Sequence, residues 1–126
     1  MVNRESLLKW ALAVFGAGFL LIYPLAIIWP SGWSWHQGPP YESQYLMMII
    51  GIYATLGVFL ILASRNPRAN TSLIWFTVWS SVVHAGIMSV QSVRGVGHMG
   101  HLVGDVPALV LTAVVLAVLV SSPRKA

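Results

Sequence analysis

Hydrophobic residues dominate four stretches of the chain, about 7–29, 44–63, 72–93 and 103–121, which short polar connectors separate. Each stretch is close to the roughly 20 residues that a helix needs to cross a bilayer. None alternates apolar and polar residues over about ten positions, as a membrane β-strand would. The pattern predicts an all-α protein, a single integral membrane domain over residues 1–126 built as a bundle of four transmembrane helices.

The three connectors differ in composition, and so in the structure that each predicts. Residues 30–43 are rich in proline and glycine and are not expected to be helical throughout. Residues 64–71 form a short polar turn, in which Asn70 or Thr71 could cap the next helix. Residues 94–102 contain three glycines, which make a continuous helix there doubtful.

Two local patterns predict how the helices bend and pack. Pro24 lies inside the first stretch, where it removes a backbone hydrogen bond and crowds the preceding turn, so we expect a kink there. Small residues recur every four positions in the last two stretches, and such rows allow helices to approach closely in a membrane. These rows are Ser81, Ala85 and Ser89, and Ala113, Ala117 and Ser121.

Composition supports a membrane location and excludes several classes of function. Hydrophobic residues make up 57% of the chain and charged residues 8%, against about 25% charged residues in soluble domains. The net charge is +4, but the basic residues are scattered and form no face for a phosphate backbone, so no nucleic-acid partner is expected. The absence of cysteine excludes disulfide exchange, thiolate zinc sites and iron–sulfur ligation.

The distribution of basic residues predicts the orientation in the membrane. Only Arg94 falls on one side of the predicted bundle, and the other six lie on the opposite side: Arg4, Lys9, Arg65, Arg68, Arg124 and Lys125. Cytoplasmic loops carry an excess of lysine and arginine, so we expect the N-terminus and the C-terminus in the cytoplasm. The first stretch is longer than the 7–15 residues of a signal-peptide core and is expected to be retained. The predicted location is the cell inner (plasma) membrane, as a multi-pass protein.

Most of the polar side chains gather toward the predicted outer half of the bundle. His84 lies about nine residues from the outer end of its stretch, or about 14 Å deep. An ionisable group at that depth normally faces the bundle interior and has a function, although a histidine bonded to a serine, threonine or carbonyl of a neighbouring helix is an alternative. We therefore expect changes at His84 to disturb the protein more than changes at lipid-facing Val78 or Val82. The candidate site comprises Glu42, His84, Gln91, Arg94, His98, His101 and Asp105, with His36 nearby.

Three of these residues are candidate metal ligands. His98, His101 and Asp105 stand at i, i+3 and i+7 and would form one stripe if the segment were helical. Imidazole and carboxylate together suit zinc, copper, iron or nickel. An alternative is that Asp105 caps the last helix ahead of Pro107, or pairs with Arg94, which is also a natural partner for Glu42. In that case the histidines would be splayed toward water.

Other chemistry finds less support. Haem held by two histidines is not expected, because His84 is deep while His98 and His101 are shallow. A single axial ligand from His84 or Met88 stays open as an alternative. No serine has the context of a nucleophile elbow, and no glycine-rich phosphate motif is present. The first stretch contains no acid, unlike small multidrug transporters of similar size. No cofactor is assigned.

The segment His101-Leu102-Val103-Gly104-Asp105-Val106-Pro107-Ala108-Leu109 looks like a family signature at the start of the last helix. With the overall plan, it resembles small bacterial four-helix membrane families, such as the DoxX-like group and neighbouring families of unknown function. The likeness in architecture covers the whole chain, whereas the motif covers about nine residues. The resemblance implies a fold and no particular reaction.

Two functions from different classes remain at this point. The first is a multi-pass membrane protein without catalytic machinery, such as an accessory subunit of a membrane complex. Its partners would be membrane lipid and other membrane-protein subunits or further copies of itself. The alternative is a redox or transport protein that binds a metal or cofactor through the outer histidine and aspartate cluster. The short connectors and the lack of a catalytic set favour the first, so an enzyme is not the expected class.

Overall fold

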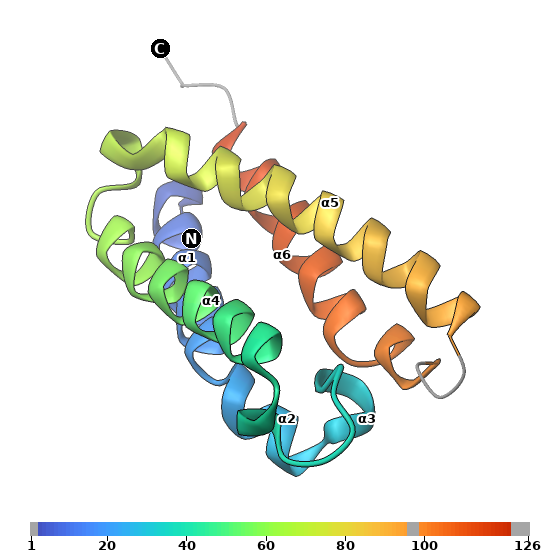
Figure 1. Cartoon of the computed structure of the whole chain (residues 1–126). Helices are drawn as coiled ribbons and strands as arrows, with labels where there is room; N and C mark the ends of the chain where they lie inside the picture. The colour runs from blue at the N-terminus through green and yellow to red at the C-terminus, as the bar shows by residue number, and fades with distance from the viewer. Residues whose placement is uncertain (1–2, 96–98, 122–126) are drawn as a thin grey trace.

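A computed structural model describes residues 3–95 and 99–121, and every regular element in these ranges is helical (Figure 1). The predicted all-α class is therefore confirmed for the described residues. The α-helices are α1 (Arg4–Leu20), α2 (Ile22–Ile28), α3 (Pro30–Trp33), α4 (Gln44–Ala63), α5 (Thr71–Arg94) and α6 (Asp105–Val120). Three short 3-10 helices join them: η1 (Pro40–Glu42), η2 (Pro67–Asn70) and η3 (Met99–Leu102).

Three segments of the described chain are long and apolar enough to cross a membrane. They are Gln44–Ala63, Pro67–Arg94 and Met99–Val120. The pair α1 and α2 also passes this test when taken together, although it is bent by 53°. By length and composition the described part of the chain therefore has three membrane-spanning candidates, or up to four if the bent pair is one span.

The bend in the first stretch lies just before Pro24, the residue from which a kink was predicted. Helix α1 ends at Leu20, and Pro24 stands in the first turn of α2. Proline has no N–H to donate to the carbonyl four residues earlier, which belongs to Leu20, and its ring crowds that carbonyl. The N–H of Leu21 instead donates to the carbonyl of Gly18 at 3.0 Å, which closes the end of α1. The predicted kink is confirmed.

The main helices form two antiparallel pairs, α1 with α4 and α5 with α6, and the pairs meet where α1 packs against α6 (Figure 1). Each main helix contributes one fully buried aliphatic side chain to the shared core. These are Leu12, Leu60, Ile74 and Leu116. Burial of these side chains holds the bundle closed along its length.

Helices α1 and α4 approach each other through two facing glycines. A methyl group added at Gly16 would lie 2.6 Å from the carbonyl oxygen of Gly57, and one added at Gly57 would lie 2.5 Å from that of Gly16. Such close backbone approach is typical of helices packed through small residues in membranes.

The packing of α5 confirms one expectation about its faces and corrects another. Ser81 and Ala85, from the row of small residues, are buried inside this chain, so this part of the row packs within the bundle. Val82 is 46% exposed, as expected of a lipid-facing residue. Val78 is only 4% exposed, so the prediction that it faces lipid is wrong. It lies on the turn below Ser81, on the side that packs against the core.

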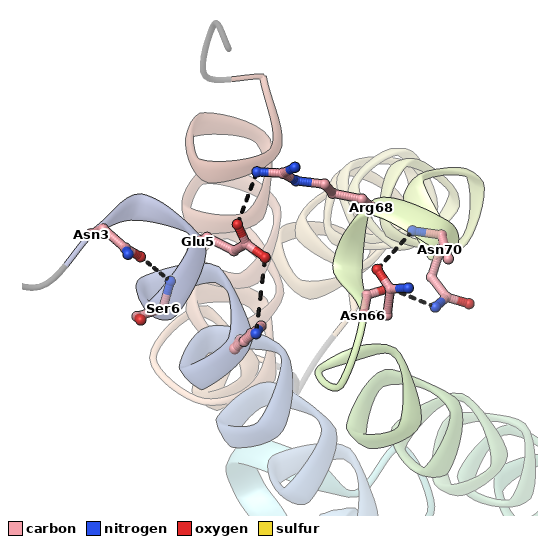
Figure 2. Close-up of polar contacts among 8 residues, drawn as sticks. Asn3, Glu5, Ser6, Asn66, Arg68 and Asn70 are labelled. Atoms are coloured by element: carbon pink, nitrogen blue, oxygen red, sulfur yellow. Dashed lines mark hydrogen bonds and ion pairs between the residues drawn. The ribbon is translucent and has the colours of Figure 1, made fainter. Parts of the chain in front are cut away.

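One end of the molecule, here called the basic end, holds the start of α1 and the turn between α4 and α5. Arg68 of that turn donates to Glu5 of α1 at 2.9 Å, and Asn3 caps α1 by accepting from the N–H of Ser6 (Figure 2). Arg94 is the last residue of α5 and lies at the far end of that helix. The described basic residues are therefore separated between the two ends, as the sequence predicted.

The predicted cap of α5 is only partly correct. Asn70 does occupy the N-cap position, but its side chain makes no capping hydrogen bond to this helix. It donates instead to the carbonyl of Asn66, at 2.9 Å (Figure 2). Asn66 caps η2 by accepting from the N–H of Ala69.

The opposite end, here called the loop end, carries the proline- and glycine-rich connector 30–43. As predicted, this connector is not helical throughout: α3 and η1 are separated by residues 34–39. Helix α3 folds back against η3, just before the start of α6 (Figure 1). This contact joins the first connector to the last one and positions the candidate site.

Candidate functional site

The loop end contains a buried cluster made by an acid, a histidine and a tryptophan. His101 of η3 and Asp105 at the start of α6 are 1% and 6% exposed, and Nδ1 of His101 lies 3.0 Å from each carboxylate oxygen of Asp105. The indole N–H of Trp35 donates to Oδ2 of Asp105, also at 3.0 Å. The rings of Trp35 and His101 are stacked, with centroids 3.8 Å apart. We refer to Trp35, His101 and Asp105 as the acid cluster.

Two glycines allow the first connector to reach this cluster. A methyl group added at Gly100 would lie 2.4 Å from the carbonyl oxygen of Ser31. One added at Gly104 would lie 2.4 Å from that of Gly32. The backbone of α3 therefore packs directly on these glycines, and Trp35 follows α3 by two residues, which brings its indole over Asp105.

A second polar contact lies deeper and joins the two helix pairs. The hydroxyl of Tyr53 in α4 is hydrogen-bonded to Nδ1 of His84 in α5, and the two rings lie 5.3 Å apart. Phe19 of α1 packs beside Tyr53, with ring centroids 5.2 Å apart. The prediction that His84 faces the bundle interior is confirmed. Its partner is a tyrosine, which the sequence analysis did not consider.

Both polar groups border one cavity between the helices, with a volume of about 450 Å³. Side chains from α1, α2, α4, α5 and α6 line it, and most of them are aliphatic or aromatic. Tyr53, His84, Gln91 and Asp105 are among its few polar lining residues. The cavity therefore combines a long apolar wall with hydrogen-bonding groups at particular points.

The indole of Trp33 adds an unused donor to this lining. Trp33 lies in α3 and borders the cavity. Its Nε1 is buried and has no hydrogen-bond partner among the described residues. Buried indole N–H groups usually find an acceptor, so this donor is free to bind an acceptor atom of a molecule in the cavity.

Cavities of about 300–1,000 Å³ with apolar walls and a few placed polar groups are typical of sites for small organic molecules. The described residues supply acceptors in Asp105, a free donor in Trp33, and a linked tyrosine and histidine. This set can orient a molecule that has a polar head and an apolar body.

The structure brings together some of the predicted site residues and separates others. His101 and Asp105 contact each other, and His101 is only 1% exposed, so the expectation that it is splayed toward water is wrong. His84 and Gln91 line the same cavity as Asp105. Arg94 makes no ion pair with Asp105 or Glu42 among the described residues, so the prediction of that pairing is wrong. Glu42 lies instead 3.9 Å from Nε2 of His36, in the connector.

The alternative role proposed for Asp105, capping of the last helix, is also corrected. Asp105 is the first residue of α6, Gly104 occupies the N-cap position, and no side chain caps this helix. The carboxylate is instead taken up by His101 and Trp35.

The predicted metal site is tested only in part. His98 lies outside the described residues, so its participation stays a prediction. Among the described residues no group of three or more histidine, cysteine or acidic side chains is arranged to hold a metal ion. His101 and Asp105 are bonded to each other at 3.0 Å, whereas each would have to lie about 2.0–2.2 Å from a shared ion.

Three aromatic residues of the site were missed as functional candidates: Trp33, Trp35 and Tyr53. Tryptophan and tyrosine near the ends of spans usually anchor a protein at the membrane interface, which hides a binding role. Tyr53 offered a signal, because it stands in the middle of an apolar span where a hydroxyl needs a partner. Trp33 and Trp35 offered none, since only the fold brings their connector to α6.

Comparison with known proteins gives one match. A family model described as a family of unknown function, DUF6632, matches residues 3–124. No curated protein and no solved structure matches the chain.

Proposed function

We propose, on the premise that this chain belongs to the DUF6632 family of unknown function, that it binds a small amphipathic organic molecule inside the membrane. The observation that carries the proposal is the cavity of about 450 Å³ between the helices, with its apolar wall and its few polar groups. The site is a binding site, and no reaction is assigned to it.

The lining indicates what kind of molecule fits. Aliphatic and aromatic side chains such as Val14, Phe15, Ile22 and Leu25 form the wall supplied by α1 and α2, which suits an apolar body. The polar head would bind where Trp33 offers a free donor and Asp105 offers carboxylate oxygens. A neutral head with both donor and acceptor atoms satisfies these groups without burying an unpaired charge.

This proposal changes the second function predicted from the sequence and keeps part of the first. The ligand is organic and lies in the cavity, whereas the sequence placed a metal at His98, His101 and Asp105. A non-catalytic role, as an accessory subunit of a membrane complex, is compatible with ligand binding and remains part of the proposal. The DoxX-like architecture and the bacterial source expected from the sequence also remain part of the proposal.

Gly18 allows a test by filling the cavity. It lines the cavity, and a methyl group added to it would meet no atom within 4 Å, so leucine fits there without a backbone clash. The full chain would be purified in mild detergent and extracted with organic solvent, and the extract analysed by mass spectrometry. A molecule that copurifies with the wild type is expected to fall to background in Gly18→Leu.

Gly51→Leu is the matched control. Gly51 is an exposed glycine of α4 that also has open space around it, and it does not line the cavity. This variant should retain the copurifying molecule. Equal amounts of the copurifying molecule in the wild type and both variants would contradict a ligand in the cavity. So would protein extracts that contain nothing beyond what an extract of detergent alone contains.

We further propose that the bent pair α1–α2 is one crossing, so that the chain crosses the inner membrane four times with both ends in the cytoplasm. The separation of the described basic residues between the two ends supports this orientation.

The orientation can be tested by cysteine labelling, because the chain has no cysteine of its own. In intact cells, a membrane-impermeant maleimide is expected to label Gln37→Cys at the loop end. It should label Ala69→Cys at the basic end only after the membrane is permeabilised. Both positions are exposed. The reverse pattern would invert the topology. Labelling of both positions from outside would exclude an odd number of crossings between them, and with it the single crossing by α4.

A further inference from the structure

A second hollow lies on the outside of the bundle, along the last four turns of α5. Its floor and sides are made by Val82, Val83, Gly86, Ile87 and Val90, and Arg94 lies at its end. Positions separated by three or four residues share one face of a helix, so this set is a continuous stripe on α5. The indole of Trp35 forms part of the wall. We call this hollow the α5 groove.

Gly86 gives the groove its depth. The valine and isoleucine side chains around it are between 46% and 59% exposed, so they project outward from the bundle. A methyl group added at Gly86 would meet no atom within 4 Å, so the space beside this residue is open. A missing side chain between projecting branched side chains leaves an open channel on this face of α5.

Arg94 places a positive charge where the channel ends. It is exposed, forms no ion pair among the described residues, and is the last residue of α5. A helix of 24 residues is about 36 Å long, slightly more than the hydrocarbon thickness of a bilayer. The guanidinium therefore lies at the level of the lipid headgroups when α5 spans the membrane.

We propose that the α5 groove is a binding site for one anionic phospholipid. An acyl chain lies along Gly86, and the phosphate is bound by Arg94. Charge and shape are complementary here: guanidinium groups bind phosphate oxygens through paired hydrogen bonds, and the channel beside Arg94 is lined mainly by valine, isoleucine and glycine, with Gln91 as a further polar residue. Gly86 and Arg94 line the groove and not the cavity, although Trp35 and Gln91 border both, so the two hollows are neighbours that share these two residues and take different ligands.

The experiment is native mass spectrometry of the full chain in detergent, titrated with dioleoyl phosphatidylglycerol or dioleoyl phosphatidylcholine. The wild type is expected to retain the anionic lipid preferentially. Arg94→Gln should reduce the ratio of bound anionic to bound zwitterionic lipid about fivefold, the effect of one basic residue near an anionic surface. Gly86→Leu should reduce binding of both lipids, because leucine occupies the channel.

Gly51→Leu is again the control, since it adds the same side chain to an exposed helix position outside the groove. It should bind both lipids as the wild type does. An unchanged lipid ratio in Arg94→Gln would overturn the proposal. So would equal lipid binding by Gly86→Leu and Gly51→Leu, because Arg94 would then bind the headgroup without the groove.

Discussion

Replacement of His101 by leucine is expected to lower the free energy of unfolding by about 1–3 kcal/mol, the usual cost of leaving a buried hydrogen-bonding group without its partner. His101 is 1% exposed, and its Nδ1 lies 3.0 Å from both oxygens of Asp105. In His101→Leu the carboxylate stays buried with the indole N–H of Trp35 as its remaining side-chain partner. The stacking of Trp35 on the imidazole is lost as well.

The measurement is the free energy of reversible unfolding in mixed micelles. It is made for the wild type, for His101→Leu, for Asp105→Leu and for the double variant, which together form a double-mutant cycle. Apolar replacement of both members of a buried pair often restores stability, so the double variant should be more stable than His101→Leu alone. If the effects of the two single substitutions simply add, the histidine and the aspartate are not coupled, and the acid cluster does not hold the loop end together.

Gly104→Ala is expected to destabilise the protein by about 1–3 kcal/mol, as overpacking of a close contact usually does. The added methyl group would lie 2.4 Å from the carbonyl oxygen of Gly32 and 2.7 Å from its Cα atom. These are backbone atoms of α3 and cannot rotate away. Helix α3 must therefore move, and Trp33 and Trp35 move with it, so the variant should also lose the molecule bound in the cavity.

Gly51→Ala and Gly86→Ala are the matched controls for this substitution. Both glycines lie inside exposed helix faces with nothing within 4 Å of an added methyl group. Alanine should stabilise each helix by about 0.5–1 kcal/mol relative to glycine. A thermal unfolding midpoint for Gly104→Ala that rises like those of the controls would show that α3 does not pack on Gly104 as described.

The apolar pattern of the sequence was sufficient to predict the helical class, because an apolar stretch of about 20 residues has few alternatives in a membrane. Helices α4 and α5 begin and end within one residue of the predicted stretches. The bend at Leu21 was predictable for a local reason, since Pro24 removes a hydrogen bond wherever its helix lies. The inward orientation of His84 followed from the cost of exposing a polar side chain to lipid.

Other features depend on which segments meet, and a local pattern cannot report that. Tyr53 and His84 are 31 residues apart and belong to different helix pairs, and Trp35 and Asp105 are 70 residues apart. The prediction for Val78 failed because an apolar side chain fits both lipid and the core, so hydrophobicity does not distinguish the two faces of a membrane helix. The sequence predicted Arg94 as a partner of Asp105 because the two side chains carry opposite charges. The actual partners are His101 and Trp35.

The amino-acid sequence by itself therefore determined the helical spans, the kink, and the separation of basic residues between the two ends, all of which arise from local energetics. Only the tertiary structure decided that Gly100 of η3 and Gly104, just before α6, admit the backbone of α3, and that the acid cluster forms there. The same holds for the cavity and the α5 groove. The physical reason is that these features come from close packing between segments distant in sequence, where single methyl groups decide which backbones can meet.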